Sequence, residues 1–416
     1  MPSVRSALFL HDHCFVQGGA SRIAIDEAVA LADRGVEVTF LGATGPVGPE
    51  LAASRVKTIC LDQPELASVG SYPAVAWQGL WNATAARRTR ELLAALDRSQ
   101  TIVHLHAYTK SLTTSPVRAA VQAGFPILAT LHDFFSICPT GNLYDYVKEV
   151  PCELKPLSPR CIVTNCDKRR YAHKLYRVAR GALQRWPGLL PSGVEHFIGL
   201  SARSTELIRP YLPRTAHVYP LGNIIDLAAR PAVDIRDGGA LLFVGRLDPE
   251  KGVRLLLEAA DRAGASMVFV GDGPLRSAVE SSGRHRVTGW QTSSQVQSEL
   301  DQARCLVFPS QWYETFGLVV SEAAARGVPA IVSDVSAAAE RIRDGITGFV
   351  FRSGDAAALA GCLAASNDTS RLANMGRNAY EAFWPAPPNR ENHVTRLLEI
   401  YGTVLDAHTA RAKALA

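Results

Sequence analysis

Several features that mark membrane, secreted and nucleic-acid-binding proteins are missing from this sequence of 416 residues. No apolar run is long enough to cross a bilayer, and residues 1–5 do not begin the basic-then-apolar pattern of a secretion signal. Internal repeats and low-complexity regions are absent. The net charge is only +5, too small for the electrostatic footprint of a nucleic-acid-binding protein. We therefore expect a cytoplasmic protein that binds no nucleic acid.

The composition is that of a soluble globular protein, with 47% hydrophobic and 20% charged residues. A chain of this length is too long for one ordinary hydrophobic core and predicts two domains of about 200 residues each. In the amino-terminal half, short apolar runs alternate with helical periodicity, which is typical of α/β domains. We expect a helix at residues 20–33 and strands at residues 7–10, 36–41, 102–105, 127–131 and 198–200.

A glycine-containing loop at residues 11–19 joins the first expected strand to the first helix. Its Gly18-Gly19 pair lets the backbone approach a bound diphosphate, although a plain turn would also use these glycines. The pair does not form the G-x-G-x-x-G pattern, so a dinucleotide-dependent dehydrogenase is poorly supported. The strand, loop, helix and strand nevertheless predict a nucleotide-binding type of unit with a right-handed crossover.

A basic loop in the carboxy-terminal half follows an expected strand at residues 240–244 and precedes a helix at 253–263. It contains Arg246 and Lys251. Arginine holds phosphate oxygens in a fork and lysine adds a mobile charge. Because open α/β sheets bind ligands at the carboxyl ends of their strands, the loop is a candidate phosphate site, and a solvated basic turn is the alternative.

A second loop follows a strand at residues 305–308 and leads into a helix that begins at Leu318. Glu314 lies in this loop, and Glu322 lies about one turn into the helix. A helix N-terminus attracts phosphate, and the two carboxylates can hold hydroxyl groups. Two ordinary first-turn glutamates are the alternative interpretation. The backbone N–H groups expected at the ligand belong to Phe316, Gly317 and Leu318.

The span from Glu314 to Glu322 matches the E-x7-E motif of the family 4 retaining glycosyltransferases. Residues 245–252 and 271–275 resemble the diphosphate-binding loops of the same family. This resemblance implies the GT-B fold, an α/β architecture with two Rossmann-like domains facing a cleft and a C-terminal helix crossing back to the first domain. The implied limits are 1–222 for the acceptor domain, 223–385 for the nucleotide-sugar domain and 386–416 for the crossover helix.

The resemblance also implies roles for individual residues. His132, in the Thr130–Asp133 stretch that ends an expected strand, matches the family's histidine near the reacting carbon of the donor sugar. Lone histidines at strand ends are more often structural, and we expect a scaffold role for His104, with His106 and Lys110 as weaker site candidates. The expected catalytic residues are His132, Arg246, Lys251 and Glu314. The expected donor-binding residues are Gly18, Gly19, Arg246, Lys251, Glu314, Phe316, Gly317, Leu318 and Glu322.

The implied reaction is retaining transfer of a hexose-type sugar from a UDP- or GDP-sugar to a glycan or lipid-linked acceptor, in bacterial cell-surface or exopolysaccharide synthesis. No Asp-x-Asp triplet occurs in the sequence, and this is the pair through which metal-dependent sugar transferases commonly hold a diphosphate. We therefore expect no divalent metal in transfer. Two alternatives remain: a nucleotide-sugar epimerase of the same fold, or a non-catalytic nucleotide-sugar-binding partner.

Four of the eight cysteines occur in one segment, at Cys138, Cys152, Cys161 and Cys166. Structural zinc sites usually contain a close Cys-x2–4-Cys pair, which Cys161 and Cys166 only approach. Disulfides are disfavoured in a reducing cytoplasm. Free structural thiols are the favoured expectation, with zinc and disulfides as alternatives.

Residues 168–180 mix basic residues with aromatic and apolar ones. Such a stretch suits the surface of an anionic bilayer, and a surface helix with a basic face explains it equally well. Since a lipid-linked acceptor favours the first interpretation, we expect a cytoplasmic protein with peripheral contact at the inner face of the plasma membrane.

Overall fold

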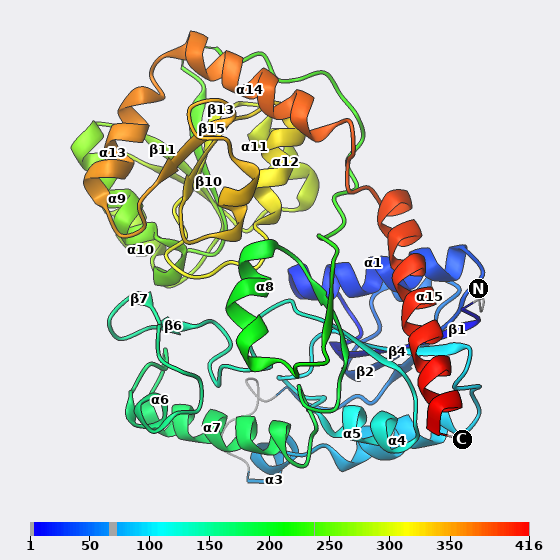
Figure 1. Cartoon of the computed structure of the whole chain (residues 1–416). Helices are drawn as coiled ribbons and strands as arrows, with labels where there is room; N and C mark the ends of the chain where they lie inside the picture. The colour runs from blue at the N-terminus through cyan, green and yellow to red at the C-terminus, as the bar shows by residue number, and fades with distance from the viewer. Residues whose placement is uncertain (1–3, 66–72, 237, 416) are drawn as a thin grey trace.

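The computed structural model describes residues 4–65, 73–236 and 238–415, so the first three residues of the amino-terminal stretch lie outside it. Two parallel β-sheets lie in separate halves of the molecule (Figure 1). The first sheet runs in the order β3 (Lys57–Cys60), β2 (Glu37–Thr44), β1 (Ser6–His13), β4 (Thr101–Leu105), β5 (Ile127–Thr130), β8 (His196–Gly199) and β9 (His217–Pro220). The second sheet runs in the order β12 (Arg286–Gly289), β11 (Met267–Val270), β10 (Ala240–Val244), β13 (Ala303–Phe308), β14 (Ala330–Ser333) and β15 (Gly348–Phe351).

Helices connect the strands of both sheets. Those of the first domain are α1 (Gly19–Asp33), α2 (Pro49–Ala52), α3 (Pro73–Gln78), α4 (Ala83–Leu93), α5 (Ser115–Gln122), α6 (Pro159–Val163), α7 (Tyr171–Arg185), α8 (Ala202–Ile208) and the short 3-10 helix η1 (Arg209–Tyr211). Those of the second domain are η2 (Pro249–Lys251), α9 (Val253–Ala263), α10 (Arg276–Glu280), α11 (Ser293–Leu300), α12 (Leu318–Arg326), η3 (Ala337–Arg341), α13 (Ala356–Ala365) and α14 (Thr369–Phe383). No helix in the described ranges has the length and apolar character needed to cross a membrane.

The strands form because short apolar runs are buried on both faces of each sheet. Every residue of β1, β4 and β5 is buried, and the core side chains of the first domain form two clusters. Parallel strands covered on both faces read as continuous apolar runs, which is the pattern seen in the sequence. Two parallel-sheet domains confirm the predicted α/β fold.

The last helix, α15 (Arg390–Leu415), leaves the second domain and returns to the first. Figure 1 shows it beside α1. Its apolar face joins the core of the first domain through Val394, Leu397 and Tyr401. His393 Nε2 also lies 2.9 Å from Glu27 Oε1 on α1. The predicted crossover helix is confirmed, and it begins at Arg390.

The predicted loop at residues 11–19 is partly wrong, because β1 continues through His13 and pairs there with Thr44 of β2. His11 and His13 are buried, and their polar side chains interrupted the apolar run that would have extended the expected strand. The predicted boundary after residue 222 falls in the segment between the two sheets, and the one after residue 385 falls between α14 and α15.

A long insertion separates β5 from β8, and we call residues 131–195 the β5–β8 insertion. It contains the antiparallel pair β6 (Tyr144–Asp145) and β7 (Val150–Pro151), followed by α6 and α7. In Figure 1, β6 and β7 lie beneath the second domain. Arg254 Nε on α9 lies 3.6 Å from Glu149 Oε1, so the insertion touches that domain.

Candidate active site

The loop after β10 holds Arg246 against two carboxylates of the same loop. Arg246 Nη1 lies 2.6 Å from Asp248 Oδ2, and its Nη2 donates to Glu250 Oε1 at 3.4 Å. Asp248 and Glu250 are buried, whereas 53% of the Arg246 side chain is exposed. The buried carboxylates therefore orient a guanidinium group that an anionic ligand can still reach.

Lys251 and Glu314, from loops after neighbouring strands, form an ion pair. The same oxygen, Glu314 Oε1, accepts hydrogen bonds from Ser310 Oγ at 2.9 Å and Trp312 Nε1 at 2.8 Å. Lys251 Nζ also lies 5.0 Å from the centre of the Trp312 ring. The predicted phosphate-binding cation and the predicted sugar-binding carboxylate thus occupy one charged cluster.

Gly317 allows α12 to begin directly beside this cluster. Its φ of 82° lies in the left-handed region, and a Cβ there would lie 2.8 Å from Ala338 Cβ. Both the backbone conformation and the lack of space require glycine. The helix N-terminus, with its partial positive charge, begins four residues after Glu314, the ion-pair partner of Lys251.

Glu322 lies on α12, one turn after the helix begins. Gln297 Nε2 donates to its Oε2 at 3.5 Å, and no lysine or arginine of the described ranges forms an ion pair with it. Burial raises the pKa of Glu322 above its ordinary value. A partly buried carboxylate without a cationic partner is suited to accept hydrogen bonds from neutral hydroxyl groups.

The first domain faces the start of α12. A Cβ at Gly19 would lie 3.6 Å from Leu318 Cδ1, whereas one at Gly18 would meet no atom within 4 Å. Thr315 Oγ1 donates across the domain boundary to the backbone oxygen of His132 at 2.9 Å. The structure therefore brings Gly19 next to the first residue of α12, and it brings the backbone of His132 to the loop that carries Glu314.

The side chain of His132 contacts a second imidazole, the buried ring of His106. His106 Nδ1 lies 2.9 Å from His132 Nε2, and burial lowers the pKa of His132 to about 3. Both rings are therefore neutral near pH 7, so one nitrogen donates and the other accepts. His104 is fully buried and hydrogen-bonds with Tyr401 Oη and Thr130 Oγ1, each at 2.8 Å. These contacts agree with the scaffold role expected for His104.

Lys110 lies near the glycine loop. Its Nζ donates to Gln17 Oε1 and lies 3.0 Å from Glu65 Oε1, while its backbone N–H donates to Asp12 Oδ2 at 2.9 Å. The contacts that Lys110 makes fix the chain beside Gly18. They give Lys110 a structural role.

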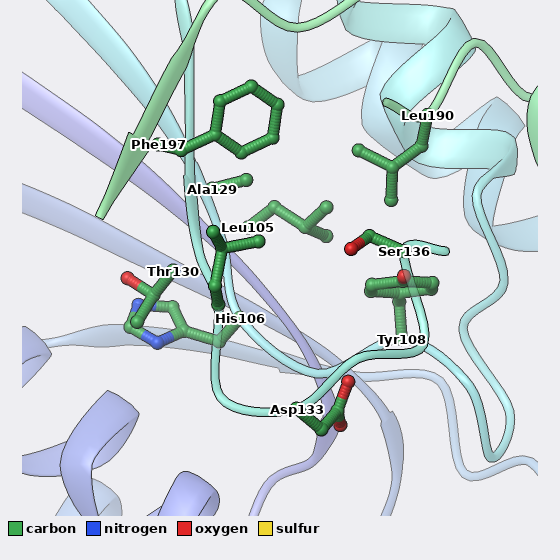
Figure 2. Close-up of a pocket in the computed structure, with 10 residues that line it drawn as sticks. Leu105, His106, Tyr108, Ala129, Thr130, Asp133, Ser136, Leu190 and Phe197 are labelled. Atoms are coloured by element: carbon green, nitrogen blue, oxygen red, sulfur yellow. The ribbon is translucent and has the colours of Figure 1, made fainter. Parts of the chain in front are cut away.

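A small cavity of about 10 Å³ is lined by Leu131 and Asp133, which follow β5, and by residues of neighbouring segments. Figure 2 shows the cavity with Asp133 at its edge. Ser136 and Tyr108 both face it, and neither hydroxyl oxygen has a hydrogen-bond partner among the described residues. Burial raises the pKa of Asp133, which also lines the cavity, to about 6. The space fits about one water molecule and is far too small for a sugar nucleotide.

Two family models match this chain and together cover both domains. The model described as Glycosyltransferase Family 4 matches residues 17–219, and the one described as Glycosyl transferases group 1 matches residues 230–382. The chain belongs to glycosyltransferase family 4. The resemblance inferred from the sequence motifs is confirmed.

Curated relatives of this family 4 chain align with part of it. Glycogen synthase of Mycobacterium tuberculosis is 33% identical over 175 residues, which is 38% of this chain and 42% of the relative. Phosphatidyl-myo-inositol mannosyltransferase of Mycobacterium leprae is 33% identical over 172 residues, 38% of this chain and 45% of the relative. Less than half of each relative is therefore aligned.

A solved structure matches the whole architecture. The Anabaena protein Alr3699/HepE superposes with a TM-score of 0.63, covering 96% of this chain and all of that one, at 18% identity. At this identity the match shows the shared GT-B fold.

Sequence analysis missed several residues of the site. Asp248 and Glu250 lie between Arg246 and Lys251 in the same loop, and this proximity in the sequence could have identified them. Lys168 Nζ reaches Asp248 Oδ1 at 2.6 Å from a position 80 residues earlier, which no local pattern reveals. Sequence analysis did not identify Arg341 either. Its guanidinium carbon lies 3.7 Å from the centre of the Phe316 ring and its Nη1 donates to the Phe316 oxygen at 2.7 Å, fixing the loop before α12.

The buried histidines of this family 4 chain predict a loss of stability in acid. Burial lowers the pKa of His11 to about 4 and holds the pKa of His104 and His106 well below the usual 6.5. Between about pH 4 and 6.5 the unfolded chain therefore binds more protons than the folded one, so stability falls as the pH falls. Each such histidine adds at most about 1.4 kcal/mol per pH unit to this slope.

Denaturant unfolding at pH 5, 6 and 7.5 measures this slope. His11→Asn keeps an acceptor for the His13 N–H, which donates to His11 Nδ1 at 2.9 Å, and is expected to lower the slope. The matched control His173→Gln changes an exposed imidazole and should leave the slope unaltered. Equal slopes in the wild type and His11→Asn would contradict the burial of a neutral His11.

Proposed function

We propose that the protein is a retaining glycosyltransferase that moves a hexose-type sugar from a UDP- or GDP-sugar to a glycan or lipid-linked acceptor. The contact between Lys251 and Glu314 at the start of α12 carries this proposal. A cation for the diphosphate and a carboxylate for the sugar hydroxyls meet there, at the carboxyl ends of adjacent strands. Arg246 lies on the same loop as Lys251 and adds a second cation.

The donor class is supported by proteins of the same fold. Alr3699/HepE was solved with UDP and also with UDP-glucose. In this chain, Arg246 and Lys251 supply positive charge, and the N-terminus of α12, which follows the Glu314 loop, supplies N–H groups. A nucleoside diphosphate linked to a sugar fits both features.

The chemistry follows from the charge that develops during transfer. The bond between the anomeric carbon and the diphosphate oxygen breaks, and the nucleoside diphosphate leaves with that electron pair. Arg246 and Lys251 neutralise the leaving group, while an acceptor hydroxyl attacks the anomeric carbon and gives its proton to the departing diphosphate. Glu314 orients the sugar, and the neutral ring of His132 contacts it without adding charge. Retention of the anomeric configuration follows the resemblance to the family.

A donor screen tests this function. The full chain is expected to show a thermal shift with one UDP- or GDP-sugar, and that donor is then incubated with glycan and lipid-linked acceptors. Transfer with retained configuration supports the proposal. An isomerised sugar formed from the donor alone indicates an epimerase, and binding without turnover across these acceptors indicates a non-catalytic binding partner. Either outcome would contradict it.

Transfer is expected to continue in excess EDTA. The sequence has no Asp-x-Asp triplet, and Arg246 and Lys251 can balance the diphosphate charge. Initial rates are compared with and without chelator, then after adding magnesium or manganese. A metal-dependent glycosyltransferase assayed in parallel verifies that the chelator is effective. Strong inhibition that either ion reverses would contradict metal-independent transfer.

We also propose action at the cytoplasmic face of the plasma membrane, in cell-surface or exopolysaccharide synthesis. Part of the basic stretch at 168–180 is used inside the protein, since Lys174 is buried and Arg177 Nε lies 3.3 Å from Asp167 Oδ2. Arg169 and Arg170 remain exposed at the start of α7. Presenting the lipid-linked acceptor in anionic and in neutral vesicles tests whether these arginines assist.

A further inference from the structure

The central part of the β5–β8 insertion is buried in part without an apolar core of its own. Between residues 144 and 189, all of which are described, no residue belongs to a hydrophobic cluster of the protein. The buried side chains in this stretch include Cys161, Cys166, Asp167 and Lys174. Small units that cannot bury enough apolar surface usually depend on a disulfide or a metal.

Four cysteines of the insertion meet at one cavity although they are spread along its sequence. The cavity has a volume of about 10 Å³, room for a single water-sized guest. Cys152 lies in the loop after β7, and Cys161 lies on α6. None of the four forms a disulfide. The cavity is lined by Cys138, Cys152, Cys161, Cys166 and Lys174, among other residues.

Lys174 provides a second, independent sign that this cavity holds negative charge. Its side chain is fully buried, and its Nζ lies 3.0 Å from Cys166 Sγ and 3.6 Å from Cys161 Sγ. No carboxylate in the described ranges forms an ion pair with it. A buried ammonium group is costly unless an anion compensates it, and the available anions are thiolates.

The Lys174 ammonium supplies only one positive charge, whereas four cysteines line the cavity. A divalent metal ion would supply the further positive charge, because it binds cysteine only as thiolate and displaces the proton.

We propose that Cys138, Cys152, Cys161 and Cys166 bind one zinc ion in a tetrahedral structural site. Zn²⁺ would replace the four thiol protons, leaving a complex of net charge −2 that the Lys174 ammonium partly balances. No three of the sulfurs lie within 4.8 Å of one another, and zinc would draw them to about 3.8 Å, the edge of a tetrahedron with Zn–S bonds of about 2.3 Å. A single ion suits the small cavity better than an iron–sulfur cluster.

The proposed site would stabilise a segment that supports the donor loop. Lys168, two residues after Cys166, lies 2.6 Å from Asp248 Oδ1 and 3.7 Å from Glu250 Oε1. These are the same carboxylates that orient Arg246. Zinc would therefore stabilise the position of Lys168 beside Asp248 and Glu250. It would make no contact with the donor sugar or the diphosphate.

Metal content of the full chain tests the proposal without reference to transfer activity. The wild-type protein, expressed with zinc in the medium and desalted, is expected to contain about one zinc ion per chain by mass spectrometry of the elements. A mercurial reagent should release this zinc to a colorimetric chelator. Because neither readout involves a sugar, the zinc proposal and the proposed transferase function can fail separately.

Variants locate the metal. Cys161→Ser with Cys166→Ser should lose the zinc, whereas Cys362→Ser, which changes a partly buried cysteine on α13, should keep it. Should the double variant fail to fold, cobalt titration of metal-stripped wild type still reports the site through sulfur-to-cobalt charge-transfer absorption. Wild-type protein without zinc, with iron and sulfide, or with disulfides among these four cysteines would overturn the proposal.

Discussion

Replacing Arg246 or Lys251 with alanine is expected to lower the rate of sugar transfer by about a hundred- to a thousand-fold, the usual cost of losing one preorganised donor. Each substitution removes a positive charge that balances the leaving nucleoside diphosphate. That charge is fully developed only as the glycosidic bond breaks, so the loss falls mainly on kcat. Lys251→Ala additionally frees Glu314 from its ion pair and is the more disruptive of the two.

Two further variants separate charge from geometry. Arg246→Lys keeps the charge but loses the planar fork, so it should retain more activity than Arg246→Ala. Arg262→Ala is the matched control, because Arg262 lies on α9 and, among the described residues, forms an ion pair only with exposed Glu258, at 2.6 Å. Steady-state kinetics measure the transfer activity of each variant, and thermal unfolding verifies that each variant is folded. Near-normal turnover in both Arg246→Ala and Lys251→Ala would disprove the phosphate assignment.

The sheets could be predicted because each strand is marked by a short apolar run in its own sequence. The strand β10 and the helix α9 have the bounds expected from the sequence, residues 240–244 and 253–263. A buried parallel strand needs a continuous apolar run, and the helix after it needs an apolar face of period 3.6. Where polar residues enter a buried strand, as His11 and His13 do in β1, this signal fails.

The site was predictable only loop by loop. Arg246 and Glu322 could be recognised because each lies in a motif that follows an apolar run. The contacts between loops could not, since the pairing of Lys251 with Glu314 joins residues 63 positions apart. The contacts of Lys168 with Asp248 and of His106 with His132 could not be predicted either. The tertiary fold brings these residues together, and no sequence spacing connects them. The four cysteines were visible as a group, but their convergence on Lys174 required the folded insertion.

Changing either glutamate of the E-x7-E motif to glutamine is expected to reduce transfer, but through different kinetic constants. Glu322, which has no cationic partner in the part of the chain that the structure describes, would accept hydrogen bonds from the ribose of the donor, a part that changes little during reaction. Losing such uniform binding raises KM more than it lowers kcat. Glu314 would lie beside the transferred sugar and orient its anomeric carbon, so Glu314→Gln should lower kcat, because orientation and charge matter most in an oxocarbenium-like transition state.

Steady-state kinetics on both variants, with product stereochemistry by NMR, test this division. Glu258→Gln is the matched control, because Glu258 lies on the exposed side of α9 and contacts Arg262. Glu314→Gln has a second diagnostic consequence. The amide carries no charge to balance Lys251, so the variant should bind free nucleoside diphosphate at least as tightly as the wild type while transferring sugar slowly. A product with inverted configuration, or a Glu322→Gln enzyme that loses kcat with its donor affinity intact, would refute these assignments.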